Sequence, residues 1–147
     1  MPRPYIAVEL KHLVIERAQG RCEYCQCRAD YATETFPIEH VVPISRGGKT
    51  ESENLALSCS SCNGHKYNAV EAIDPISDSL IPLYNPRQHE WTKHFGWNEG
   101  YSRIIGITPT GRATVVRLQM NHLGSVNLRK ALYFVGKHPP KNFEKSK

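Results

Sequence analysis

The chain has 147 residues, 39% of them hydrophobic, and a formal net charge of +5, which suits one domain or one domain with an appended region. No apolar run approaches the roughly 18 residues that a membrane span needs, and the N-terminus lacks the apolar stretch of a signal peptide. We therefore expect a cytoplasmic protein without a membrane partner. Thiols stay reduced there, so the five cysteines are better read as metal ligands than as disulfides.

The positive charge is concentrated in the second half. Residues 1–79 contain eight Lys and Arg against eleven Asp and Glu, a balance of −3, whereas residues 80–147 contain eleven against three, a balance of +8. This asymmetry indicates that a polyanion binds the C-terminal half. A solvated basic surface with a Lys-rich tail is the alternative, and charge alone identifies no function.

The first 74 residues combine helical and extended patterns with two tight cysteine turns. In chain order we expect a helix at 7–19, a strand at 36–42 that ends before Pro43, a mobile glycine-containing loop at 45–50, a strand at 54–57, and a helix from Asn63 to about residue 70.

The pattern changes beyond residue 74. We expect a linker at 73–79, an aromatic stretch at 91–97, a strand at 103–107, a strand or a short helix at 112–120, and a helix at 124–136. The prediction is therefore a domain at 1–74 and a mixed α/β, basic extension at 75–147 that packs on it and helps to hold a nucleic acid. The aromatic stretch suits core packing better than a base-stacking surface.

Two Cys-x2-Cys turns, Cys22–Cys25 and Cys59–Cys62, give the strongest local signal. Zinc prefers tetrahedral thiolate coordination, and two such turns complete its shell without an open position for water. This spacing predicts a structural zinc site. Cys27 could replace Cys25 as a ligand, but we expect it to be a bystander thiol.

Residues with catalytic potential lie between the two turns and directly after the second. Hydrolysis of a phosphodiester requires a base for water and a hard cation for the developing charge. The imidazole of His40 can accept a proton at neutral pH, and oxygens of Glu39 and Asn63 suit Mg²⁺ or Mn²⁺. Asn54 can hydrogen-bond to His40 or its backbone and orient the ring. Because adjacent strand residues point to opposite faces, Glu39 and His40 can serve one phosphate only at a strand end.

The stretch from Arg21 to Tyr67 resembles the HNH endonuclease family of the ββα-metal fold. The resemblance rests on Cys-x2-Cys, Ile-Glu-His-Val-Val-Pro-Ile-Ser-Arg-Gly-Gly, Glu-Asn-Leu and Cys-x2-Cys-Asn-x2-Lys, although the family more often has Asp before the histidine. It implies that His40 is the general base, that Glu39 and Asn63 bind the catalytic metal, and that Asn54 is the middle asparagine of the signature. It also implies structural zinc on the four cysteines and DNA cleavage that leaves 5′-phosphate and 3′-hydroxyl ends.

The resulting prediction is an α+β, zinc-stapled ββα-metal domain with a basic extension, acting as a metal-dependent DNA endonuclease. We expect Arg46, Lys49 and Lys66 to contact the DNA backbone. Such a site cuts one strand, so the protein would act as a monomer or a homodimer. A non-catalytic zinc-ribbon protein that binds nucleic acid is the main alternative, and a zinc-stapled protein–protein adaptor is the third.

Overall fold

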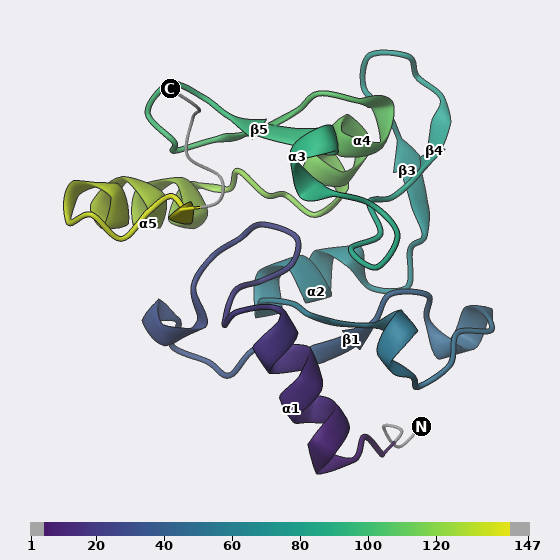
Figure 1. Ribbon diagram of the computed structural model, residues 1–147. Helices are drawn as coiled ribbons and strands as arrows, with labels where there is room; N and C mark the ends of the chain where they lie inside the picture. The colour runs from purple at the N-terminus through teal and green to yellow at the C-terminus, as the bar shows by residue number, and fades with distance from the viewer. Residues whose placement is uncertain (1–4, 142–147) are drawn as a thin grey trace. The chain divides into compact units, whose positions relative to one another are not determined.

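The computed structural model describes residues 5–141, which form short helices and two-stranded sheets (Figure 1). They divide into two compact units, each described here by itself. The first unit comprises the described residues up to Val70 together with Asn85–His89, and the second comprises Glu71–Tyr84 and the residues from Glu90 onward. The expected division lay after residue 74. The observed units differ from it in two places, because residues 71–74 belong to the second unit and Asn85–His89 belong to the first.

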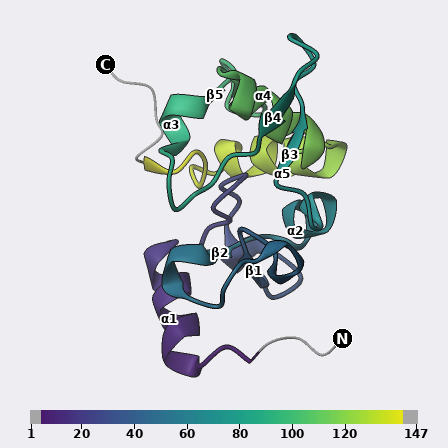
Figure 2. The same cartoon turned by 90° about the vertical axis from the view of Figure 1, so that its right-hand side faces the viewer.

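The first unit has an α+β architecture built around one small hairpin. Strands β1 and β2 pair antiparallel, with Glu39 opposite Ala56 and His40 opposite Leu55 (Figure 2). Its elements are α1 (Val8–Arg17), β1 (Ile38–His40), β2 (Leu55–Leu57), α2 (Ser60–Lys66) and three 3₁₀ turns at Ala29–Tyr31, Ile44–Arg46 and Ser52–Asn54.

Helix α1 lies where the sequence predicted a helix, and it packs on β2. Val14 has no exposed surface, and Arg17 Nη2 donates a hydrogen bond to the Leu55 carbonyl at 2.8 Å. Helix α2 begins earlier than expected, because Cys59 Sγ accepts a hydrogen bond from Cys62 N and so caps the first turn. The second cysteine turn is therefore the beginning of the helix that carries Asn63.

The second unit contains more regular structure than the sequence indicated. The segment expected to be a linker is the connection between the two strands of a β-hairpin, and the ambiguous segment forms a helix that Thr108 caps through Gly111 N. Its elements are β3 (Glu71–Ile73), β4 (Leu80–Pro82), α3 (Trp91–His94), β5 (Phe95–Trp97), β6 (Ile104–Gly106), α4 (Pro109–Arg117) and α5 (Leu123–Phe134). Strand β3 pairs with β4, and β5 with β6, both antiparallel.

The aromatic stretch of this unit packs on itself. The ring of Phe95 lies 5.1 Å from those of Tyr84 and Trp91, and Trp91 lies 5.4 Å from Trp97. Gly111 allows α4 to approach closely, because a Cβ there would lie 1.9 Å from the carbonyl oxygen of His94. These rings therefore belong to the core, as the density of aromatic residues suggested.

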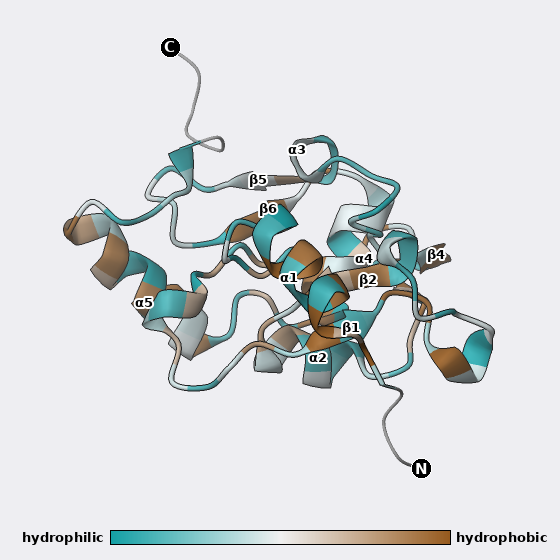
Figure 3. Ribbon diagram, turned by 60° about the horizontal axis from the view of Figure 1, so that its bottom comes forward, coloured by the Kyte–Doolittle hydropathy of each residue, from teal (hydrophilic) through white to brown (hydrophobic). Residues whose placement is uncertain are grey.

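Helices α1 and α5 both mix hydrophilic and hydrophobic residues along their length (Figure 3). Helix α5 buries Val126, Arg129 and Leu132. Within residues 5–141, no helix combines the length and the apolarity that crossing a bilayer requires.

Asp74 fixes the start of the β3–β4 turn and joins it to α4. The side chain has no exposed surface, and its carboxylate accepts hydrogen bonds from the Arg112 guanidinium at 2.8 and 2.9 Å and from Ile76 N and Ser77 N at 3.2 Å each. The hydrogen bonds from Arg112, followed by those from Ser77 and the turn, hold the pKa of Asp74 well below its ordinary range.

We predict that Asp74→Asn destabilises the second unit at neutral pH. Because the pKa of Asp74 is lower in the folded state, its stabilising contribution is full above the ordinary pKa, about 3.9. It is lost as the pH falls further, so the difference between variant and wild type narrows below about pH 4. Urea unfolding followed by tryptophan fluorescence measures this, since Trp91 and Trp97 both lie in this unit.

Asp78→Asn is the matched control for this substitution. It removes the same charge from the same turn, but Asp78 is exposed, and asparagine tolerates its positive φ of 60°. Equal stability of the Asp74→Asn variant and wild type at pH 7 would contradict the role assigned to Asp74.

Candidate functional site

Four cysteine sulfurs of the first unit form a buried cluster. The thiols of Cys22, Cys25, Cys59 and Cys62 lie within 4.8 Å of one another, and Cys25 Sγ lies 3.7 Å from Cys59 Sγ. Tetrahedral zinc with bonds of about 2.3 Å separates its sulfurs by about 3.8 Å, so the cluster fits that ion. Backbone N–H groups point at the sulfurs: Cys25 N lies 3.4 Å from Cys22 Sγ, and Cys62 N lies 3.3 Å from Cys59 Sγ.

Cys27 is half-buried and is not one of the four clustered ligands, although its thiol interacts with those of Cys22, Cys25 and Cys59. Its carbonyl oxygen accepts a hydrogen bond from Cys22 N at 2.9 Å, which closes the turn of the first Cys-x2-Cys pair. The backbone of Cys27 therefore shapes the metal site, while Cys25 occupies the position for which Cys27 was the alternative.

A cavity of about 480 Å³ in the first unit brings three of the residues predicted for the site together. Glu39 and His40 reach it from β1, and Asn63 reaches it from the middle of α2. The objection that neighbouring strand residues face opposite ways is met here, because β1 ends at His40 and both residues line the same cavity. An acidic oxygen, an amide oxygen and an imidazole are thus available at one place.

The imidazole of His40 is held by Thr50. Nε2 lies 2.8 Å from Thr50 Oγ1, and among the described residues no hydrogen bond involves Nδ1. Burial lowers the pKa of His40, which favours the neutral ring. No sequence pattern singled out Thr50, since a threonine at the end of a glycine loop is common and only the folded loop brings it to the ring.

Asn54 holds the loop between the two strands. Its Oδ1 accepts a hydrogen bond from Val42 N at 2.9 Å, and its Nδ2 donates to the carbonyls of Val42 and Lys49 at 3.0 and 2.9 Å. A Cβ at Gly48 would lie 1.7 Å from Val42 O, so the close approach requires glycine there. The loop expected to be mobile is thus fixed by side-chain and backbone bonds, and Asn54 acts on the loop rather than on the ring of His40.

The carboxylate of Glu39 is buried between two donors. Tyr24 Oη donates a short hydrogen bond to Oε1, and Lys66 Nζ lies 3.3 Å from Oε2. Burial raises the pKa of Glu39, and the Lys66 ammonium and the Tyr24 hydroxyl oppose that shift. Burial also raises the pKa of Tyr24 well above its ordinary value, so its hydroxyl keeps the proton that it donates.

The position of Lys66 does not fit the expected contact with DNA. Its side chain is 2% exposed, and Nζ donates a hydrogen bond to Val41 O at 2.8 Å besides pairing with Glu39. A buried ammonium pays a large desolvation cost unless it is paired, which explains why the lysine turns inward. Arg46 and Lys49 are exposed, and Arg46 Nε donates to Asn68 O at 2.6 Å.

Tyr67 ends α2 in a backbone conformation that is unusual for its residue type. Its φ of 52° and ψ of −116° match the first central position of a type II′ turn, which Ala69 N closes on Lys66 O at 2.9 Å. Glycine ordinarily occupies that position, and such strain costs roughly 1–3 kcal/mol for other residues. The side chain lines the cavity and is 76% exposed.

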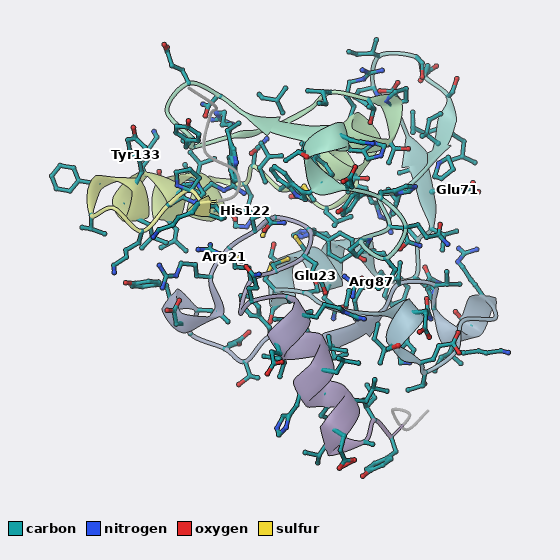
Figure 4. All side chains as sticks on the ribbon, in the orientation of Figure 1. Arg21, Glu23, Glu71, Arg87, His122 and Tyr133 are labelled. Atoms are coloured by element: carbon teal, nitrogen blue, oxygen red, sulfur yellow. The ribbon has the colours of Figure 1, made fainter. Side chains whose placement is uncertain are left out.

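The segment Asn85–His89 is tied to the first unit through an ion pair. The Arg87 guanidinium makes a short salt bridge with Glu23, and both side chains are labelled in Figure 4. Glu23 Oε2 also accepts a hydrogen bond from Leu57 N at 3.0 Å. Arg87 therefore does not add to a free basic surface, although it contributes to the positive charge of the second half of the sequence.

Comparison with known proteins gives two findings. A sequence model of the HNH endonuclease family matches residues 22–69, about a third of the chain. The chain is also 28% identical over 123 residues to the Septu protein PtuB of Bacillus thuringiensis, a match that covers 82% of this chain. The chain spans 43% of the length of that relative. The matched segment contains all four clustered cysteines and the residues of the cavity from Glu39 to Tyr67.

We predict that Cys59→Ser abolishes zinc binding and unfolds the first unit, because the binding energy of a four-thiolate site contributes directly to folding. Zinc content by atomic emission should fall from about one per chain to near zero, with a loss of helical circular dichroism. Cys27→Ser is the matched control and should retain both. If Cys27→Ser also loses zinc, the four-ligand set is wrong.

Proposed function

A sequence model of the HNH endonuclease family matches residues 22–69 of the chain, and from that match we propose that the protein is a metal-dependent DNA endonuclease. The observation that carries the proposal is that Glu39, His40 and Asn63 line one cavity beside the four-cysteine cluster's second turn. A base and two hard oxygen donors around one space are what hydrolysis of a phosphodiester requires.

The donor set fits a hard divalent cation. Glu39 and Asn63 would hold Mg²⁺ or Mn²⁺, which prefer carboxylate and amide oxygens and keep several waters. Both carboxylate oxygens of Glu39 already accept from a neighbour, but each has two lone pairs, so a further ligand can be accommodated. Ligating carboxylates are commonly held by such outer hydrogen bonds. When bound, the cation supplies positive charge that stabilises the phosphoryl oxygens and the departing 3′-oxygen.

The residues of the chain perform the remaining steps. His40 takes a proton from a water at Nδ1, while Thr50 Oγ1 accepts the Nε2 hydrogen bond and keeps the ring in place. The hydroxide attacks phosphorus, the bond to the 3′-oxygen breaks, and that oxygen takes a proton from solvent. The products are a 5′-phosphate and a 3′-hydroxyl. Asn54 fixes the loop that carries Thr50.

Exposed basic residues would bind the DNA backbone. In the first unit, Arg46 and Lys49 lie on the loop that follows β1, and they remain the proposed phosphate contacts. In the second unit, Arg112 pairs with Asp74 and Arg129 is buried. We therefore propose that the other Lys and Arg residues of that unit attract the DNA backbone. The exposed ones among those described are Lys93, Arg103, Arg117, Lys130, Lys137 and Lys141.

One active site cuts one strand, so we propose nicking by a monomer, with double-strand cleavage requiring a homodimer or two events. The cytoplasm is the proposed compartment, since the cysteine cluster suits reduced thiols. The competing function is a zinc-ribbon protein that binds nucleic acid without cutting it.

We predict that wild-type protein nicks supercoiled plasmid in Mg²⁺ or Mn²⁺, and that His40→Ala lowers the nicking rate at least about 100-fold, since a general base contributes roughly 10²–10⁴-fold. DNA binding measured by gel shift should be unchanged. His12→Ala is the control, because His12 is an exposed histidine of α1.

Two outcomes would reject the proposed function. Equal nicking by wild type and His40→Ala would show that this site does not cut. Binding without any cleavage by wild type, in either metal, would favour the non-catalytic alternative.

We further predict that Tyr24 is a positioning residue for Glu39. Tyr24→Phe removes the hydrogen bond to Oε1 and should weaken Mn²⁺ binding about 10-fold, a typical effect of losing an outer hydrogen bond of a ligand. Electron paramagnetic resonance of free Mn²⁺ measures this without reference to activity. Tyr31→Phe, on an exposed residue of the same unit, should have no effect.

Lys66→Met tests the opposite oxygen of the same carboxylate. It removes one partner of a buried ion pair, so it should also lower stability, by roughly 3–5 kcal/mol. Zinc content is therefore measured alongside Mn²⁺ affinity, and the comparison is made on zinc-loaded protein. Unchanged Mn²⁺ affinity in the Tyr24→Phe variant would remove the positioning role.

A further inference from the structure

The cavity at the proposed active site has two kinds of wall. Glu39, His40 and Asn63 form its polar part, and the proposed chemistry uses all three. The rest of the lining is apolar or aromatic, and no step of the hydrolysis requires it. It consists of Ile6, Pro37, Ile38, Pro43, Ile44 and Tyr67.

An apolar wall beside a phosphodiester site cannot bind the phosphate, which needs charge and hydrogen-bond donors. It can bind the part of the nucleotide that has apolar faces, namely the base. The cavity volume of about 480 Å³ lies within the ordinary range for sites that enclose a small molecule. The cavity therefore has room for more than a phosphate and its cation.

Tyr67 is the residue of this wall that is best suited to a base. It is 76% exposed, and among residues 5–141 its ring makes no stacking contact and its hydroxyl no hydrogen bond. It occupies a turn position that favours glycine, so the fold would be more stable without a side chain there. An exposed aromatic ring kept in a strained position at the edge of a catalytic cavity indicates a role in binding.

We propose that Tyr67, with Ile44 on the same cavity, binds an unstacked nucleobase next to the scissile phosphate, and that the substrate is DNA with an unpaired nucleotide at the cleavage site. This inference rests on the proposed function. In a duplex each base is covered on both faces by its neighbours, so only a single-stranded or locally unpaired nucleotide offers a free face to the tyrosine. Ile44 is 48% exposed and can cover the base edge.

The binding experiment uses zinc-loaded, full-length protein without a catalytic metal, so that no cleavage occurs. Fluorescence anisotropy compares a 20-nucleotide single strand, the matching duplex, and the duplex with two unpaired nucleotides at its centre. We expect the single strand and the interrupted duplex to bind at least about fivefold more tightly than the intact duplex. Tyr67→Ala should weaken binding to these two by between about 5-fold and 100-fold, the range for removing an aromatic ring that stacks on a base, and should leave duplex affinity unchanged.

Two further variants separate binding from a structural role. Tyr67→Phe keeps the ring and should bind as wild type does. Tyr67→Gly removes the ring and relieves the backbone strain, so it should lose the preference for unpaired DNA while raising the thermal midpoint of the first unit. A purely structural tyrosine would give lower binding only together with lower stability. Tyr31→Ala, which removes an exposed tyrosine that does not line the cavity, is the control.

Equal affinity of the wild type for intact duplex and single strand would overturn the proposal, and so would unchanged binding by Tyr67→Ala. A negative result for base binding by Tyr67 can be told apart from a negative result for the proposed endonuclease activity. If the wild type nicks plasmid and His40→Ala does not, the endonuclease stands whatever Tyr67 does. Negative supercoiling favours local unpairing of the two strands. We therefore also expect a relaxed plasmid to be nicked more slowly than a supercoiled one.

Discussion

The first unit depends on one constraint, the convergence of four thiols from two turns that are separated by 33 residues of sequence. A domain of this size has little core of its own around a three-residue hairpin, and a zinc ion bound by the four sulfurs would add to its stability. The second turn is also the start of α2, since Cys59 caps that helix. The metal site, the helix that carries Asn63 and the strand that carries His40 therefore form one connected arrangement.

The same two turns also determine the surroundings of Glu39. Tyr24 lies inside the first Cys-x2-Cys turn, and Lys66 lies one helical turn after Cys62. Each contributes one donor to one oxygen of the carboxylate. An ion in the cysteine cluster would thus act on the cavity without touching it, by fixing the two side chains that hold the proposed ligand. The side chain of Glu39 reaches between these two donors.

The cavity combines polar side chains, which hydrogen bonds hold in place, with an apolar wall. Glu39 is held by buried donors, His40 by Thr50, and the loop between them by Asn54 and Gly48. Under the proposed function, little in this arrangement would need to move before a phosphate binds, and such preorganisation is the usual source of electrostatic catalysis. Tyr67 differs from these residues, because its conformation is strained and its ring is exposed.

The sequence by itself determined what depends on spacing and local pattern. The doubled Cys-x2-Cys identified the four thiols that cluster, the pattern around His40 led to the family that the comparisons support, and helical periodicity located α1 and α5 to within two residues of their observed ends.

Only the tertiary structure decided which side chains face one another. Thr50, Tyr24 and Lys66 meet His40 and Glu39 across 10 to 27 residues, and Lys66, which the sequence placed at the DNA backbone, is a buried partner of a carboxylate. The hairpin at 71–82 and the return of Asn85–His89 to the first unit were equally hidden. The physical reason is the same in each case: burial and pairing depend on residues distant along the chain, and no local pattern encodes them.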